Sequence, residues 1–251
     1  MRSISFDAAA DYYDATRSLP PEPMARTVEA LAGLLARRRT VEVGSGTGRF
    51  SIPLQRAGID LVPVDLARRM LAVGVGKGMR SSVLADASGL PFRDGAFGAA
   101  LSVHVLHLVA DWRNVIREIG RVVSGDYVAV LDNWDGFSLN RTYVEALTEQ
   151  GIPENAPGVR ERELAQLVPP RRRLDVTTYQ DTLDADGGIA LLDQRTYSSQ
   201  WTVPDEAHAK AMAVLRERYA GKRFERTLHI GLAVWDAAEL AAGLDSLPVF
   251  Q

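Results

Sequence analysis

The sequence contains no cysteine, which excludes disulfide bonds, thiolate metal sites and a cysteine nucleophile. It also lacks a long apolar run, because no stretch approaches membrane-spanning length and the first residues carry no apolar signal core. We therefore expect a soluble, cytoplasmic protein without a membrane partner. Charges of the two signs nearly balance, since the sequence has 29 basic and 32 acidic residues and a net charge of -3. This balance gives no electrostatic reason to expect a nucleic acid as partner.

Strand-like and helix-like segments alternate through the first half of the chain. Short apolar strands are predicted at residues 41–43, 60–64, 82–84, 99–105 and 127–131. Helices are predicted at residues 6–17, 24–38, 49–57, 66–75 and 112–122. This alternation is typical of an α/β fold with a parallel sheet and helices on both faces. After Trp134 the alternation breaks, and we expect helices at 137–150, 159–168 and 204–219 and strands at 174–183 and 227–235.

A glycine-rich turn follows the first predicted strand. It reads Gly44-Ser45-Gly46-Thr47-Gly48, with a glycine at every second position. Glycine tolerates positive φ and has no Cβ to block the approach of a ligand to the backbone. The pattern therefore predicts a site where a small polar or charged ligand lies against the turn.

Acidic residues end the next two predicted strands. Asp65 lies 21 residues after Gly44, and Asp86 lies 21 residues after Asp65. Parallel strands place their carboxyl ends at one edge of the sheet, where ligands of open α/β sheets bind. A carboxylate at Asp65 can accept both hydroxyls of a ribose, and Asp86 can accept from the amino group of adenine. Leu66 and Met70 are expected to be apolar walls for the base.

Two kinds of nucleotide cofactor are compatible with these positions. A dinucleotide site uses the pattern G-x-G-x-x-G, and here the last glycine is replaced by Arg49. This departure disfavours NAD or FAD. The pattern present, Glu42-x-Gly44-x-Gly46-x-Gly48 after a strand, resembles motif I of the class I S-adenosylmethionine-dependent methyltransferases.

Other blocks of the sequence carry the same resemblance, over about residues 5–132. They are similar to blocks of the small-molecule branch that contains the quinone-biosynthesis methyltransferases (methyltransferase type 11). The matching blocks are Phe6-Asp7 through Tyr13-Asp14 and Arg17, residues 64–71 around Val64-Asp65, residues 85–87 with Leu90-Pro91-Phe92, and Arg117-Glu118-Ile119 with Arg121-Val122.

The resemblance implies a Rossmann-like fold with a mainly parallel seven-stranded sheet and a helical lid. It implies transfer of a methyl group from S-adenosylmethionine to a small molecule, with S-adenosylhomocysteine as product. It also assigns the cofactor-binding positions. Gly44, Ser45 and Gly46 would line the methionine portion, and Glu42 would support the turn. Asp65 would hold the ribose, and Asp86 and Ala87 would hold the adenine edge. Ser102 or Val103 would pass beneath the sulfonium, and Tyr13 and Arg17 would fold over the cofactor.

The residues that receive or activate the acceptor are less defined. His104 and His107 follow the fourth strand, where the acceptor of the family approaches; His104 is either a base or a histidine bonded to backbone at a strand end. Trp134 is either a wall of the acceptor pocket or a cap on the core. Tyr197 and Trp201 are candidates for acceptor recognition or parts of a turn before a helix. The four histidines form no compact metal-ligand pattern, and we expect no metal.

We expect one methyltransferase domain over residues 1–251, as a monomer or homodimer. Its cofactor-binding core would span residues 24–136, and residues 1–23 and 137–222 would form a lid with the acceptor elements. The alternatives are a nicotinamide-dependent oxidoreductase and a non-catalytic S-adenosylmethionine-binding regulator. The sequence leaves open whether the acceptor atom is oxygen, nitrogen or carbon, and a base is needed only if that atom carries a proton to lose.

Overall fold

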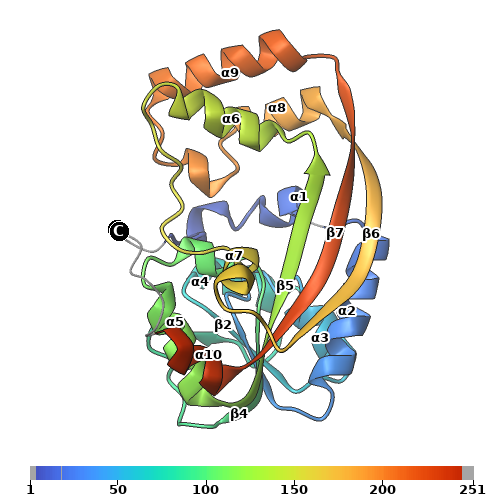
Figure 1. Ribbon diagram of the computed structural model, residues 1–251, viewed down its shortest axis with the longest axis vertical. Helices are drawn as coiled ribbons and strands as arrows, with labels where there is room; N and C mark the ends of the chain where they lie inside the picture. The colour runs from blue at the N-terminus through green and yellow to red at the C-terminus, as the bar shows by residue number, and fades with distance from the viewer. Residues whose placement is uncertain (1–3, 18, 245–251) are drawn as a thin grey trace. The chain divides into compact units, whose positions relative to one another are not determined.

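The computed structural model describes residues 4–17 and 19–244 (Figure 1). The strands are β1 (Thr40–Val43), β2 (Leu61–Asp65), β3 (Val83–Leu84), β4 (Phe97–Ser102), β5 (Val123–Gly136), β6 (Arg172–Asp184) and β7 (Arg223–Asp236). The α-helices are α1 (Tyr13–Arg17), α2 (Pro21–Leu35), α3 (Ser51–Arg56), α4 (Arg68–Gly76), α5 (Trp112–Val122), α6 (Leu139–Thr148), α7 (Glu161–Leu167), α8 (Ala185–Asp193), α9 (Asp205–Tyr219) and α10 (Ala237–Gly243). The 3₁₀ turns are η1 (Asp7–Ala9), η2 (Leu106–Leu108) and η3 (Ser198–Gln200).

The strands form one seven-stranded sheet in the order β3-β2-β1-β4-β5-β7-β6. The pairings β2–β3, β1–β2, β1–β4 and β4–β5 are all parallel. The α/β fold predicted from the alternation of segments is therefore confirmed. The direction in which strands are added reverses between β1 and β4, and such a switch point opens a crevice at the carboxyl ends of the strands.

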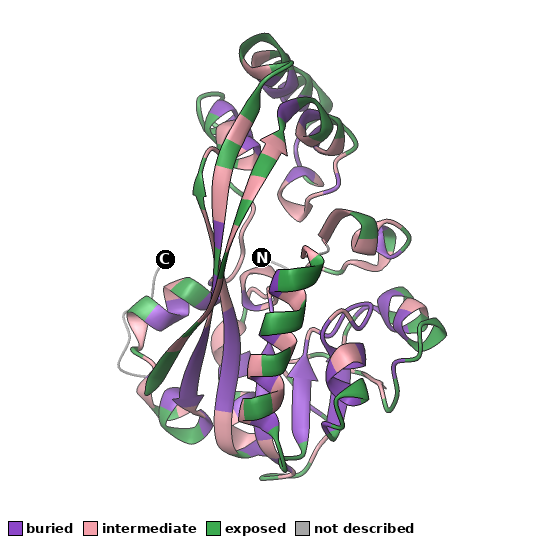
Figure 2. Ribbon diagram, turned by 90° about the vertical axis from the view of Figure 1, so that its right-hand side faces the viewer, coloured by how far each residue is buried: buried purple, intermediate pink, exposed green. Residues whose placement is uncertain are grey.

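The chain divides into two compact units. Unit 1 comprises residues 1–132, 157–177 and 230–251. Its central strands are buried (Figure 2), and β1 is buried at every position, as expected for a parallel strand covered on both faces. The helices α5 and α10 approach closely, because a Cβ atom on Gly120 would lie only 2.5 Å from the Cβ of Ala241. Unit 1 therefore has a continuous apolar core beneath the strand ends.

Unit 2 comprises residues 133–156 and 178–229. The helices α6, α8 and α9 pack against one another in it (Figure 1). Within their apolar core, the Tyr143 hydroxyl and Nδ1 of His208 form a buried hydrogen bond of 2.7 Å. The edge strand β6 has no buried residue, and its charged side chains protect an edge that could otherwise pair with another chain.

Three parts of the secondary structure differ from expectation. The helix predicted over residues 6–17 is broken into η1 and the short α1, because the carboxylates of Asp7 and Asp11 bind Arg69 instead of remaining on a helix surface. The helices α8 and α10 were not predicted. α8 contains two adjacent glycines, which weaken the helical signal, and its N-terminus is capped by the side chain of Asp184.

Residues 124–126 lie inside β5, at a register shift opposite β4. A Cβ atom on Gly125 would lie 2.4 Å from the carbonyl oxygen of Gly98. The glycine is therefore required by the close approach of two strands, which a sequence pattern of turn residues does not reveal.

Candidate functional site

The glycine turn after β1 adopts the backbone that its sequence predicts. Gly44, Gly46 and Gly48 have φ of 73°, 56° and 81°, in the region that other residues avoid. The space left by the missing side chains is filled by the protein: Cβ atoms would lie 2.4 Å from Val105 at Gly44 and 2.9 Å from Met79 at Gly48. Two of the glycines are thus needed for backbone conformation and for packing, in addition to any contact with a ligand.

Asp65 connects the end of β2 to the glycine turn. One carboxylate oxygen accepts the N–H of Gly46 at 2.7 Å, and the other accepts the N–H of Ala67 at 2.8 Å. Burial raises the pKa of Asp65, and these N–H bonds act in the opposite direction. The backbone N–H of Leu66 is a third hydrogen-bond donor to this carboxylate. Because a carboxylate has about four acceptor positions, Asp65 shapes the turn and keeps some acceptor capacity.

Glu42 supports the same turn from within β1. It is buried, and one of its oxygens accepts a hydrogen bond from the Ser51 hydroxyl at the start of α3. Burial raises the pKa of Glu42 to about 7, although the Ser51 bond and the nearby Arg49 lower it. The side chain lies inside the sheet, which agrees with a supporting role for Glu42 beneath the turn.

The N-terminal segment lies against the glycine turn. The Thr47 hydroxyl donates to Asp14 at 2.6 Å, and a guanidinium nitrogen of Arg49 donates to the carbonyl of Arg17 at 2.5 Å. Tyr13 packs edge-on against Phe6. These contacts place Tyr13 and Arg17 beside the turn, where the resemblance positions them.

Of the two expected walls for the base, one is covered and the other is exposed. Met70 is 2% exposed and packs under the aromatic rings of Phe6 and Tyr13, whereas Leu66 is 46% exposed. Leu66 is therefore the wall that solvent or a ligand reaches directly.

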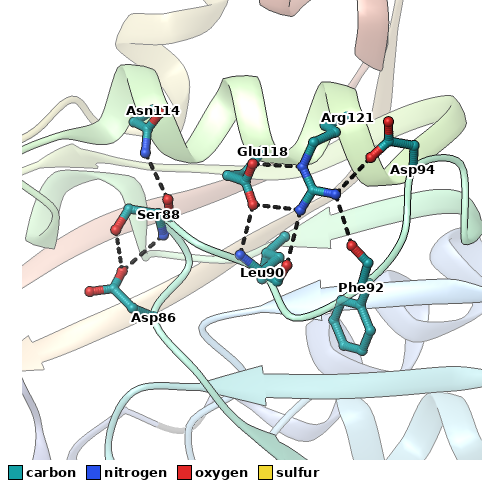
Figure 3. Close-up of polar contacts among 8 residues, drawn as sticks. All are labelled: Asp86, Ser88, Leu90, Phe92, Asp94, Asn114, Glu118 and Arg121. Carbon is teal, nitrogen blue, oxygen red and sulfur yellow. Dashed lines mark hydrogen bonds and ion pairs between the residues drawn. The ribbon is translucent and has the colours of Figure 1, made fainter.

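Asp86 follows β3 and is exposed. One of its oxygens accepts both the N–H and the hydroxyl of Ser88, at 2.8 Å and 2.7 Å. The loop beyond it is fixed to α5 (Figure 3): Asn114 donates to the Ser88 carbonyl, and Glu118 accepts the N–H of Leu90. The position of Asp86, with Ala87 packed on the core beside it, is thus set by contacts with the helix α5.

Arg121 completes this loop anchor. Its guanidinium donates to the carbonyls of Leu90 and Phe92 and to the carboxylates of Glu118 and Asp94 (Figure 3). The bond to Arg121 lowers the pKa of Glu118. Two sequence blocks that carry the family resemblance are therefore one hydrogen-bonded structure, whose effect is to hold the loop at the end of β3.

At the end of β4, the side chain of Ser102 points into the core. Its hydroxyl and that of Tyr127 are 2.6 Å apart, and both residues are fully buried. Burial raises the pKa of the Tyr127 hydroxyl, so this pair remains neutral. The Ser102 hydroxyl is thus committed to the core, and the next residue, Val103, leads the backbone out to the edge.

His104 follows in a left-handed conformation with φ of 57°. Its Nε2 lies 3.1 Å from a carboxylate oxygen of Asp132 on β5. His107 is in η2, and burial lowers the pKa of its imidazole to about 4, with His104 acting in the same direction. Both histidines thus follow β4, and their role toward a cofactor or an acceptor stays a prediction.

Glu161 belongs to this site and was not predicted from the sequence. It is buried at the first position of α7, and one oxygen accepts the N–H groups of Val105 and Leu106 at 2.9 Å and 3.3 Å. Gly158 lies against the same turn, since a Cβ there would be 2.0 Å from the Leu106 carbonyl oxygen. The only signal in the sequence is a glutamate at a helix start, which is also the commonest place for a surface glutamate.

Three expected acceptor residues lie in unit 2. Trp134 has the guanidinium of Arg226 over its ring at 4.0 Å. Trp201 donates its indole N–H to the carbonyl of Arg195 at 2.9 Å, and Tyr197 packs on the unit 2 core. Contacts within unit 2 thus account for the positions of these side chains, and their role toward an acceptor stays a prediction.

Two features are not found among the described residues. In residues 4–17 and 19–244, no three histidine, aspartate or glutamate side chains gather in a way that could hold a metal ion. Over the same residues, no helix combines the length and apolar character that crossing a membrane requires.

Parts of the chain are similar to known proteins. Residues 41–129 match the family model described as a methyltransferase domain. The chain is 32% identical over 122 residues to the demethylmenaquinone methyltransferase of Renibacterium salmoninarum, covering 47% of the chain and 52% of that protein. It is 30% identical over 121 residues to a biotin biosynthesis bifunctional protein of Cellvibrio japonicus, covering 47% of the chain and 24% of that protein.

A solved structure resembles the whole fold. It is an S-adenosylmethionine-dependent methyltransferase of Thermotoga maritima, with a TM-score of 0.51 at 20% identity, covering 91% of this chain and 98% of that one. Residues 41–129 are therefore similar to a methyltransferase domain, and the predicted α/β fold with a mainly parallel seven-stranded sheet is confirmed. The chain spans about half the length of one matched curated relative and about a quarter of the other.

Proposed function

We propose that this protein transfers a methyl group from S-adenosylmethionine to a small-molecule acceptor. The observation that carries the proposal is Asp65, which holds the glycine turn through Gly46 while keeping free acceptor capacity at the edge of the sheet. A vicinal diol is the ligand best matched to such a carboxylate. The adjacent Asp86, at the end of the next strand, supports an adenine next to that ribose.

The residues present fit the cofactor. Ser45 is buried within the glycine turn, and in the described part of the chain its hydroxyl has no hydrogen-bond partner. A buried unpaired hydroxyl is unfavourable unless a ligand pairs with it. Gly44, Ser45 and Gly46 would hold the polar methionine end, and Tyr13 and Arg17 would cover it.

Bound S-adenosylmethionine would supply a methyl group already activated by a sulfonium. The tasks left to the protein are to align the acceptor with that methyl group and to exclude water. Residues 1–23 and 137–222 remain our proposed source of acceptor contacts. The cytoplasmic location and the monomeric or homodimeric state expected from composition are also part of the proposal.

The contacts of Arg49 weigh against the nicotinamide alternative. Its side chain lies over Phe50 and donates to the Arg17 carbonyl, where a dinucleotide site would need a glycine for close helix packing. The non-catalytic regulator retains the same cofactor site and differs only in lacking transfer. Detection of a labelled methyl group on any acceptor separates it from the enzyme.

The proposal is tested by calorimetric titration with S-adenosylhomocysteine. Asp65→Ala should weaken binding by about 1–3 kcal/mol, the size of a lost charge-assisted hydrogen-bond pair. Asp60→Ala is the matched control, because Asp60 is an exposed aspartate whose ion pair with Arg39 is 3.9 Å long. Unchanged affinity in Asp65→Ala, or thermal stabilisation by NADH and not by S-adenosylhomocysteine, would contradict the proposal.

A further inference from the structure

The parts of β5, β6 and β7 that belong to unit 2 have two different faces. Side chains alternate between the faces of a strand, so residues two apart share one face. One face holds only polar residues, most of them exposed, and contacts of Asp135 with His229 and of Thr182 with Glu225 identify it. This pattern is that of a sheet face in contact with water.

The opposite face, which we call the inner face, is mainly apolar. Its apolar side chains, none of which is exposed, are Trp134, Tyr179, Leu183, Phe224 and Leu228. Two of them, Leu183 and Phe224, pack on the helical core of unit 2. The charged residues of the inner face are Arg226 of β7 and Asp181 of β6, which form an ion pair. This pair is therefore set in apolar surroundings.

Arg226 is fixed from two directions. Its Nε and Nη2 atoms donate to the same carboxylate oxygen of Asp181, at 3.0 Å and 2.6 Å. Its guanidinium carbon lies 4.0 Å from the centre of the Trp134 ring, within the range of a cation–π contact. The side chains of Arg226 and Asp181 are 25% and 30% exposed. Residues of three strands thus hold one half-buried guanidinium in a defined position.

Part of this guanidinium is unused. A guanidinium has five N–H donors in one plane, and Nε and Nη2 form one of its edges. Asp181 occupies that edge, whereas in the described part of the chain Nη1 has no hydrogen-bond partner. The second edge, formed by Nη1 and the remaining N–H of Nη2, is therefore available. Arg195 differs, because its Nη1 and Nη2 donate to two carbonyls and to Asp205.

We infer that the free edge of Arg226 binds a carboxylate or phosphate group of the methyl acceptor, whose apolar body lies on the inner face beside Trp134 and Tyr179. The inference rests on the proposed methyl transfer and names its substrate class. Two parallel N–H groups on one edge match two oxygens of a carboxylate or phosphate. Sites for small molecules combine apolar and aromatic side chains with a few placed polar groups of this kind.

The charges around Arg226 favour an anion over a cation. A cation would meet the positive guanidinium, and the Asp181 carboxylate already accepts two N–H bonds. The acids Asp135 and Glu225 belong to the opposite face of the strands. Because Arg226 is partly buried, its attraction for an anion is less screened than that of an exposed arginine. A neutral ligand would leave the free edge to water.

Binding is tested by NMR of protein labelled with ¹⁵N-tryptophan. The sequence has four tryptophans, so single substitutions assign every indole signal. The probes are 2-naphthoate, 2-naphthyl phosphate and the neutral methyl 2-naphthoate. Both anions should shift the Trp134 signal, and the one that binds more tightly identifies the anionic group. The signal of Trp201, whose N–H donates to the Arg195 carbonyl, should not change.

Substitution of Arg226 isolates the contribution of its guanidinium. Arg226→Gln should weaken binding of both anions by at least about 10-fold and leave binding of the ester nearly unchanged. Arg226→Lys keeps the charge but not the planar fork, so it should recover only part of the loss. Arg216→Gln is the matched control, because it removes another Arg–Asp pair of unit 2, that of Arg216 with Asp193, which is 2.7 Å long.

Asp181→Asn decides the question if Arg226→Gln does not fold. The amide keeps an oxygen acceptor for Arg226 and removes the negative charge that competes with a ligand. Binding of both anions should then tighten by about threefold or more. Weaker binding of the anions in this variant would contradict the inference.

Transfer is tested with labelled S-adenosylmethionine and naphthoates that carry an amino, hydroxyl or sulfanyl group, each compared with its methyl ester. The acids should be methylated in preference to the esters. In Arg226→Gln, the KM for an acid should rise by at least about 10-fold while kcat changes much less. An anchoring contact of this kind acts equally on the bound substrate and on the transition state.

Calorimetric titration with S-adenosylhomocysteine separates the two levels of failure. If the wild-type protein does not bind it, the proposed function fails, whatever is found at Arg226. If the protein binds it but neither anion shifts the Trp134 signal, the inference is wrong while the cofactor site stands. Equal binding of the anions by Arg226→Gln and the wild type, or equal methylation of acids and esters, would overturn it in the same way.

Discussion

Four described residues other than glycine have a positive φ, among them one at the end of β4 in unit 1 and one before η3 in unit 2. His104 in unit 1 has φ of 57°, and Arg195 in unit 2 has φ of 53°. Arg195 stabilises its own turn: its guanidinium donates to the carbonyls of Gln200 and Val203 at 2.9 Å and 2.6 Å, and its own carbonyl accepts the indole N–H of Trp201. A second guanidinium nitrogen of Arg195 donates to Asp205 at the start of α9, at 2.7 Å.

The turn at His104 is stabilised from outside. Glu161, distant in the sequence, accepts the backbone N–H groups, and Asp132 binds only one imidazole nitrogen. The same unfavourable backbone conformation is therefore stabilised in two different ways. Arg195 uses its side chain to stabilise its own turn, whereas the backbone at His104 is stabilised by Glu161.

The largest effect on this comparison is expected from Glu161→Ala. The substitution leaves the buried N–H groups of Val105 and Leu106 unpaired, and each such group costs about 1–3 kcal/mol. We expect the free energy of unfolding in urea to fall by about 3 kcal/mol. The control is Glu163→Ala in the same helix, which removes a partly exposed ion pair with Arg160 and the capping bond from the Arg160 N–H, and which should lower stability by only about 1 kcal/mol. Equal losses in the two variants would remove Glu161 from its supporting role.

A second, smaller effect is expected on the pH dependence of stability when His107 is replaced. The pKa of His107 is about 4 in the folded protein, below its ordinary value of 6.5, so the unfolded chain binds the proton more tightly. Stability from this residue is present above pH 6.5 and is lost as pH falls toward 4. Allowing for partial exposure, His107→Gln should lessen the loss of stability between pH 7 and pH 4.5 by about 2 kcal/mol.

Glu42 gives the opposite slope and acts as an internal check. Its pKa is raised from 4.5 to about 7, so its contribution to stability is present below pH 4.5 and is lost as pH rises toward 7. Glu42→Gln should therefore raise stability at pH 8 relative to pH 5, compared with the wild type. If both variants change the pH dependence of urea unfolding in the same direction, burial is not the cause of one of these shifts.

Much of the cofactor half could be predicted because its features are local in sequence. The glycine turn requires positive φ at fixed positions, and the equal spacing of Gly44, Asp65 and Asp86 follows from successive strand-helix units. Parallel pairing then places these residues at one edge. Glu118 and Arg121 belong to a sequence block that resembles the family, but the sequence does not show that both side chains bind the loop after Asp86.

The remainder depends on contacts between distant residues, which no local pattern records. Glu161 meets Val105 across 56 positions of sequence. The space beside Gly44 is filled by Val105, and Gly125 is required by Gly98 on another strand. In unit 2, the alternation of residues predicts a strand. The sequence does not predict that Arg195 binds two carbonyls, because those bonds depend on how its loop folds back.

The smallest expected effect is that of Arg195→Met, which tests the unit 2 half of the comparison. Methionine keeps the apolar stem but removes the donors to two carbonyls, so the free energy of unfolding should fall by about 1–2 kcal/mol. Asp205→Ala is the control, because Asp205 is fully exposed and its ion pair with Arg195 should contribute little. Calorimetry of Arg195→Met should give the wild-type affinity for S-adenosylhomocysteine, since the clamp is internal to its loop. A loss of affinity with unchanged stability would assign Arg195 to ligand binding and would end the distinction between the two turns.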